Sequence, residues 1–143
     1  MKQKVLAVDP GDKRIGLAIS DDWGVIANPF YILKHISREK DALEILRLAT
    51  EKDVEKIIIG SSYDDDNQLT PQGRKAQKLA DTIRRLGFAD IELWDEFEST
   101  KTAQKTRLKM GVKRSKRRGH LDDMAATIIL QSYLDEQKEK RKV

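Results

Sequence analysis

The stretch Val5-Leu6-Ala7-Val8-Asp9-Pro10-Gly11-Asp12-Lys13-Arg14-Ile15-Gly16-Leu17-Ala18-Ile19-Ser20 decides the fold. It holds two apolar runs separated by a Pro-Gly turn signal, which predicts strands over about 3–9 and 14–20 joined by a tight turn. The first strand ends on Asp9, and a carboxylate in an apolar strand is costly to bury unless another group compensates its charge. Asp9 is therefore either a site residue that meets a metal ion or a bound phosphate, or an ordinary turn aspartate.

Length and composition limit the class of protein. The chain has 143 residues with 38% hydrophobic and 36% charged residues, which fits one folded domain over 1–137 followed by a basic tail over 138–143. It contains no cysteine, so disulfides and thiolate metal sites are excluded. The sequence has neither an apolar stretch of membrane-spanning length nor a signal-peptide pattern, which favours a soluble cytoplasmic protein without a membrane partner.

Three further strands follow from the apolar pattern. A third strand is expected near 25–33, where Pro29 favours a sheet edge or a bulge. The β-branched run 57–59 predicts a buried central strand. The run 91–94 predicts a last strand that leads directly into Asp95-Glu96.

Helices are expected between and after these strands. They cover about 38–52, Pro71 to Gly87, Ser99 or Thr100 to about Met110, and 120–137. Ser37 and Thr70 are the expected N-caps of the first two helices. The predicted buried faces are Ala42, Leu43, Leu46 and Ala49 in the first helix, Ala76, Leu79, Ala80 and Ile83 in the second, and Leu121, Met124, Ala125, Ile128, Ile129 and Tyr133 in the last. This element order predicts an α/β fold with a mixed five-stranded sheet and helices on both faces.

Acidic residues stand at the points where such a fold gathers ligands. Asp9 and Asp95-Glu96 follow two strands that we expect to be parallel, and Asp122 opens the last helix. Carboxylate oxygens are hard ligands that suit Mg²⁺ or Mn²⁺. Two such ions about 3.5–4 Å apart can clamp the attacking and leaving oxygens of a phosphodiester. The pattern therefore predicts a site for one or two divalent ions that acts on nucleic acid.

The positive charge is concentrated in one segment. Residues 105–118 hold eight basic and no acidic residues, so within a net charge of +4 the rest of the chain carries −4. Such a patch favours docking of a polyanion, although a solvated charge run is the plainer alternative. Lys13 and Arg14 flank Asp9 and are further candidates for phosphate contacts. The predicted nucleic-acid-binding residues are Lys13, Arg14, Lys113, Arg114, Lys116, Arg117 and Arg118.

The chain resembles the YqgF/RuvX family of RNase H-like nucleases. Four motifs carry the resemblance in the family's order: Val8-Asp9-Pro10-Gly11-Asp12-Lys13-Arg14-Ile15-Gly16; Ile58-Ile59-Gly60 with Pro71; Trp94-Asp95-Glu96 with Ser99-Thr100; and Gly119-His120-Leu121-Asp122 with Ala125-Ala126. The resemblance implies an RNase H-like fold and a metal-dependent hydrolase. It places the catalytic and metal-binding acids on Asp9, Glu96 and Asp122, and gives Asp95 a supporting role. Family members are nucleases that process the 5′ end of precursor 16S ribosomal RNA.

Other functions stay open from the sequence. A Holliday junction resolvase would act on branched DNA, typically as a symmetric dimer, and nothing here separates a monomer from a homodimer. A catalytically impaired nucleic-acid-binding factor would fit two departures from the family pattern: Phe97-Glu98 after the Asp-Glu pair, and the acidic run Asp64-Asp65-Asp66. The spacing from Asp9 to Gly16 also resembles the phosphate loop of actin-like ATPases, which need a second copy of the fold.

Overall fold

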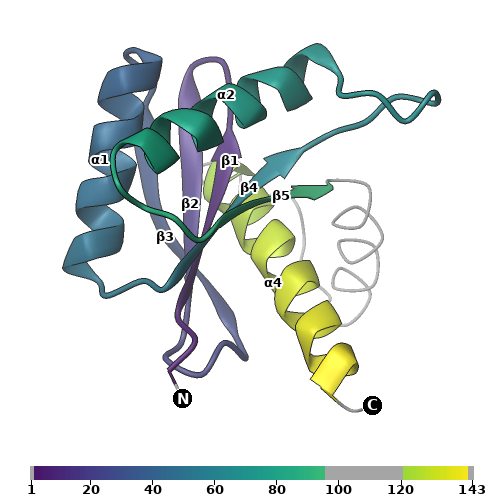
Figure 1. The fold of residues 1–143 in the computed structure, drawn as a ribbon. Coiled ribbons are helices and arrows are strands. Elements are labelled where there is room, and N and C mark those ends of the chain that lie inside the picture. The colour runs from purple at the N-terminus through teal and green to yellow at the C-terminus, as the bar shows by residue number, and fades with distance from the viewer. Residues whose placement is uncertain (1, 96–120, 142–143) are drawn as a thin grey trace.

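The computed structural model describes residues 2–95 and 121–141 (Figure 1). The elements in this part of the chain are β1 (Val5–Pro10), β2 (Arg14–Ser20), β3 (Ala27–Lys34), α1 (Arg38–Glu51), β4 (Lys56–Ser61), α2 (Pro71–Arg85), β5 (Ile91–Asp95) and α4 (Leu121–Arg141). The strands form one sheet in the order β3-β2-β1-β4-β5. β1, β2 and β3 pair antiparallel, whereas β1, β4 and β5 pair parallel. The predicted mixed five-stranded sheet is thereby confirmed.

The β1–β2 hairpin closes through a tight turn that requires glycine at its start. The backbone N–H of Gly11 donates to the carbonyl oxygen of Arg14 at 3.0 Å. A Cβ atom at Gly11 would lie only 2.4 Å from that same oxygen. Both predictions for Pro29 are confirmed, because β3 is the edge strand and its register with β2 shifts between Leu17 and Ala18. Proline is tolerated there because an edge strand need not donate from every backbone N–H.

Helices cover both faces of the sheet, as predicted. α1 and α2 lie on one face, where they pack against alternate residues of the strands such as Leu6, Val8 and Ile57. α4 lies on the other face and packs against Ala7 and Ile58. Burying both faces explains why β4 reads as an unbroken apolar run rather than an alternating one.

The predicted buried face of α1 is wrong in part. Leu43 is 54% exposed, and the buried apolar residues are Ala42, Ile45, Leu48 and Ala49. At about 100° per residue, Leu43 lies some 140° from the centre of this face. The predicted caps are confirmed: Ser37 accepts a hydrogen bond from the backbone of Lys40, and Thr70 accepts one from that of Gly73. The stripe predicted for α2, Ala76, Leu79, Ala80 and Ile83, is buried.

The last helix differs from its prediction in face and length. Ile129 and Tyr133 are buried as predicted, but Met124, Ala125 and Ile128 are only half-buried. The buried positions on either side of the confirmed pair are Ala126, Leu130 and Leu134. α4 also continues to Arg141, four residues past the predicted end, so basic residues occupy its last turn. Cations are favourable there because they face the negative end of the helix dipole.

The helix predicted over 99–110 and the basic loop 111–119 lie outside the described residues. Within the described residues, no helix is long and apolar enough to cross a membrane.

Candidate functional site

The candidate site lies at the edge of the sheet where β1, β4 and β5 end. These three strands are parallel, so their carboxyl ends share one edge. Asp9 occupies this edge on β1 and is half-buried, opposite Gly16 of β2. Asp95 ends β5 and is also half-buried, in register with Ser61 of β4. The sheet therefore brings Asp9 and Asp95 to the same edge, as the sequence predicted.

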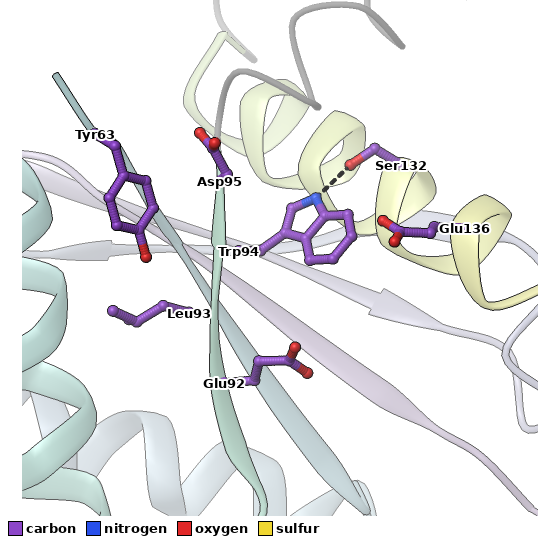
Figure 2. Close-up of a pocket in the computed structure, with 7 residues that line it drawn as sticks. All are labelled: Tyr63, Glu92, Leu93, Trp94, Asp95, Ser132 and Glu136. Carbon is purple, nitrogen blue, oxygen red and sulfur yellow. Dashed lines mark hydrogen bonds between the residues drawn. The ribbon is translucent and has the colours of Figure 1, made fainter. Parts of the chain in front are cut away.

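The two carboxylates point to opposite faces of the sheet. Side chains alternate along a strand, and Ala7 on β1 belongs to the core beneath α4, so Asp9 faces α4 as well. Trp94 shares that face, whereas Asp95 points to the other side (Figure 2). Gly60 lies on β4, the strand between β1 and β5, and pairs with Trp94. Because glycine has no side chain, none lies between Asp9 and Trp94 on this face. Asp95 thus lies on the side away from Asp9, and its supporting role stays a prediction.

Helix α4 begins at the same edge. Its middle is anchored to β5 by the indole N–H of Trp94, which donates to the hydroxyl of Ser132 at 2.8 Å (Figure 2). Its last residue, Arg141, lies 3.5 Å from the side-chain oxygen of Gln3, just before β1. The helix therefore runs opposite to β1, with its first turn toward the Asp9 edge (Figure 1). The backbone of Asp122, the second residue of α4, lies in that first turn.

The remaining predicted acids are only partly described. Glu96 and the side chain of Asp122 lie outside the described residues, as do Lys113, Arg114, Lys116, Arg117 and Arg118. No group of three or more metal-ligating side chains occurs among the described side chains, and of the three predicted ligands these include only Asp9. The convergence of Asp9, Glu96 and Asp122 on a metal stays a prediction.

The two cations that flank Asp9 are exposed on the rim of this edge. Lys13 lies in the β1–β2 turn and Arg14 begins β2. Two contacts hold the turn in place: the backbone N–H of His35 donates to the carbonyl of Lys13 at 2.9 Å, and the ammonium of Lys75 on α2 lies 2.9 Å from the Asp12 carboxylate. The hydrogen bond and charge of Lys75 lower the pKa of Asp12 below its ordinary value.

An open groove of about 480 Å³ follows β5 next to this edge (Figure 2). Its lining mixes carboxylates with aromatic and hydroxyl groups, from Tyr63, Glu92, Leu93, Trp94, Asp95, Ser132 and Glu136. The groove passes from the α2 side of the sheet, where Tyr63 lies, to the α4 side, where Ser132 and Glu136 lie. Acidic groups would repel a phosphate, so the rim at Lys13 and Arg14 suits a nucleic-acid backbone better than this groove does.

Two residues near the site were not predicted from the sequence. Ser61 lies beyond the strand predicted over 57–59, yet it ends β4 in register with Asp95, and within the described residues its buried hydroxyl has no hydrogen-bond partner. A serine that directly follows an apolar strand was the available signal. The other feature is Asp41, a buried carboxylate that pairs with the ring of His35 and accepts the backbone N–H of Ile36 at 3.0 Å. The buried face expected for this helix consisted of apolar residues only, so the sequence did not single out Asp41.

The chain matches known proteins over nearly its whole length. The family model RuvX, described as Holliday junction resolvase, matches residues 3–136. A candidate pre-16S rRNA nuclease of Clostridioides difficile is 38% identical over 132 residues, which cover 92% of this chain and 94% of the relative. A protein of the same name from Thermoanaerobacter pseudethanolicus is 38% identical over 138 residues, covering 96% and 99%.

Solved structures agree on the fold. The RuvC protein of T. thermophilus in complex with a Holliday junction substrate superimposes with a TM-score of 0.63 at 15% identity, over 96% of each chain. The Fowlpox virus resolvase in complex with Holliday junction DNA gives a TM-score of 0.56 at 16% identity, over 94% of this chain and 99% of that one. At such identities the likeness establishes the fold, which is the RNase H-like fold expected from the sequence.

Proposed function

The chain belongs to the RuvX family, and from this premise we propose that it is a divalent-metal-dependent nuclease, a hydrolase that cleaves phosphodiester bonds in structured RNA. The observation that carries the proposal is the placement of Asp9 and the first turn of α4 at one edge of the sheet. The names of the curated relatives support precursor 16S ribosomal RNA as the substrate, and 5′-end processing in ribosome biogenesis would take place in the cytoplasm.

The donor set fits a hard divalent cation. Asp9 is half-buried at the strand end, where it keeps one side toward solvent, and the other proposed ligands, Glu96 and Asp122, are also carboxylates. These three residues would hold one or two Mg²⁺ or Mn²⁺ ions. Such ions, when bound, lower the pKa of water for attack on phosphorus and stabilise charge on the leaving oxygen.

The chain's own residues would position the nucleic acid. Lys13 and Arg14, on a turn held by His35 and Lys75, would bind phosphates on either side of the cleaved bond. Trp94 and its bond to Ser132 would fix α4 relative to β5, and so set the separation of Asp122 from Glu96. The segment 105–118 would add affinity that falls with salt.

Cleavage of a 5′-extended 16S precursor tests the proposal. Wild-type protein is incubated with this RNA in Mg²⁺, Mn²⁺ or EDTA, beside Asp9→Asn and the matched control Asp65→Asn, which removes an exposed carboxylate from the β4–α2 loop. We expect metal-dependent cleavage by wild type and the control, and none by Asp9→Asn, whose neutral amide is a poorer ligand. Cleavage by Asp9→Asn at the wild-type rate would refute the role of Asp9.

A second candidate function is resolution of Holliday junctions, because the family model carries that description. A four-way DNA junction in the same assay separates the two substrates, and paired symmetric cuts would indicate a dimer. Salt-sensitive RNA binding without cleavage of either substrate, equal in wild type and Asp9→Asn, would instead establish a non-catalytic binding factor.

A further inference from the structure

Helices α1 and α2 lie side by side on one face of the sheet but differ in charge (Figure 1). α1 carries three basic and four acidic residues, whereas α2 carries five basic residues and one acidic residue. The first turn of α1 contains two acids, as is favourable next to the positive end of a helix dipole. The first turn of α2 contains none. Basic and acidic residues are thus nearly equal in number in α1, as expected of a solvated surface helix, whereas basic residues predominate in α2.

The excess cations of α2 form a stripe on its solvent side, which we name the α2 stripe and define as Arg74, Lys78 and Arg85. At about 100° per residue these three positions fall within roughly 40° of one another, opposite the buried stripe that includes Ile83. All three are exposed. At about 1.5 Å per residue the α2 stripe extends over roughly 16 Å.

Among the described residues, the α2 stripe has no anionic partner. Within residues 2–95 and 121–141, no carboxylate forms an ion pair with Arg74, Lys78 or Arg85. The two arginines are instead held in place by neutral groups: Arg74 donates to the carbonyl of Leu69 at 3.0 Å, and Arg85 donates to the hydroxyl of Thr82 at 3.1 Å. Each guanidinium has five N–H donors, so both keep donors for a ligand.

The neighbouring arginines behave differently. Arg47 on α1 pairs with Glu44 and Glu51, and Arg84 on α2 pairs with Asp81. Arg47 and Arg84 thus have acidic partners on their own helices, whereas Arg74 and Arg85 of the α2 stripe have none among the described residues.

The α2 stripe begins beside the candidate site. Lys75, next to Arg74 in sequence, reaches across to Asp12 in the β1–β2 turn at 2.9 Å. That turn carries Lys13 and leads into Arg14. A polyanion that crosses the Asp9 edge thus meets Lys13 and Arg14 close to the start of α2.

We propose that the α2 stripe binds the phosphate backbone of the RNA that flanks the cleaved segment. This inference rests on the proposed nuclease function and extends it to a second contact surface. A nucleic-acid duplex carries one charge per about 1.7 Å of axis, so a stripe of this length faces several phosphates. The exposed positions of α2 include no aromatic or branched aliphatic side chain, so the anchors typical of protein interfaces are missing from this helix.

The test measures binding rather than cleavage. Arg74→Gln/Lys78→Gln/Arg85→Gln is compared with wild type and with Lys138→Gln/Lys140→Gln/Arg141→Gln, which removes the same charge from the far end of α4. Glutamine is nearly as good a helix former as arginine and lysine, so α2 should stay folded. Lys78→Gln alone, which removes no side-chain hydrogen bond or ion pair among the described residues, serves as a second, milder variant.

The assay is fluorescence anisotropy of a labelled 5′-extended precursor RNA in EDTA, over a range of KCl concentrations. Each lost phosphate contact lowers the slope of log K against log salt by about 0.7–0.9. We expect the triple α2 variant to lose about 2–3 units of slope and at least about tenfold in affinity near 0.1 M salt. Lys78→Gln should lose about 1 unit, and the α4 variant should keep the wild-type slope.

The outcomes separate the two proposals. Wild-type binding with an unchanged slope in both α2 variants would overturn the inference and leave the proposed function intact. A loss of slope as large in the α4 variant would also overturn it, because the effect would then come from net charge alone. Wild-type protein that binds neither this RNA nor a four-way DNA junction would overturn both proposals.

Discussion

The hydrogen bond between Trp94 and Ser132 is expected to fix the distance between the two elements that carry the proposed acids. The indole N–H donates to the serine hydroxyl at 2.8 Å in a buried setting, and that hydroxyl donates to the carbonyl of Ile129 at 2.7 Å. Trp94 also meets the ring of Tyr133 edge-on, with 5.2 Å between the ring centres. The perturbation is a double-mutant cycle of Trp94→Phe and Ser132→Ala.

The cost of each change follows from these contacts. Ser132→Ala leaves the indole N–H buried without its partner, which costs about 1–3 kcal/mol of unfolding free energy. Trp94→Phe loses the same hydrogen bond and about 40 Å³ of packed volume, which at about 24 cal/mol per Å³ adds roughly 1 kcal/mol. In the double variant the bond is lost only once. We therefore expect it to cost about 1 kcal/mol less than the sum of the single variants.

Urea unfolding at pH 7 supplies the four free energies. Cleavage of the precursor RNA should fall further in Ser132→Ala than the unfolded fraction accounts for, since a displacement near 1 Å can cost about 10²-fold in rate. Ile45→Val is the control, because Ile45 is fully buried on the inner side of α1, on the other face of the sheet from α4, so this change should lower stability without a further loss of cleavage. A double variant whose loss of unfolding free energy equals the sum of the losses in the two single variants within about 0.3 kcal/mol would refute the reasoning.

Two further predictions concern turns. Gly11→Ala should lower the unfolding free energy by about 1–3 kcal/mol and reduce cleavage more than RNA binding. The reason is that the Cβ of the new alanine would lie 2.4 Å from the carbonyl oxygen of Arg14. A variant with the stability and cleavage of wild type would contradict this. Burial acts to raise the pKa of Asp21, but the backbone N–H groups of Ile26 and Val25 outweigh it and lower that pKa below its ordinary value. Asp21 therefore stabilises the fold above about pH 4 and loses this effect as the pH falls through its lowered pKa. The difference in unfolding free energy between wild type and Asp21→Asn, measured with urea, should narrow as the pH falls below about 4. A difference that stays constant would show that the charge of Asp21 does not affect stability.

Local features of the fold were readable from the sequence because their causes are local. The Pro-Gly turn after Asp9, the caps at Ser37 and Thr70 and the buried run at Ile58 each depend on a few neighbouring residues. The helix faces were predicted less well. α1 and α4 have apolar residues on more than one side, so their periodicity was compatible with several rotations about the helix axis. In α1 the side that carries Leu43 is the one that faces solvent. Packing against the sheet selects among these rotations.

The sequence by itself determined the order of elements along the chain, the hairpin whose first strand leads to Asp9, and the family, because hydrophobic period, turn residues and motif spacing are properties of the chain alone. Tertiary structure decided how the site is assembled. It put Asp9 and Asp95 on opposite faces of one edge, placed the first turn of α4 at that edge, and brought Lys75 of α2 to Asp12 in the β1–β2 turn. In the sequence, the charges of α2 were counted together with those of all other residues outside 105–118, which sum to −4. Only the burial of its apolar side against the sheet collects its cations on one surface, because burial fixes which side of a helix meets water.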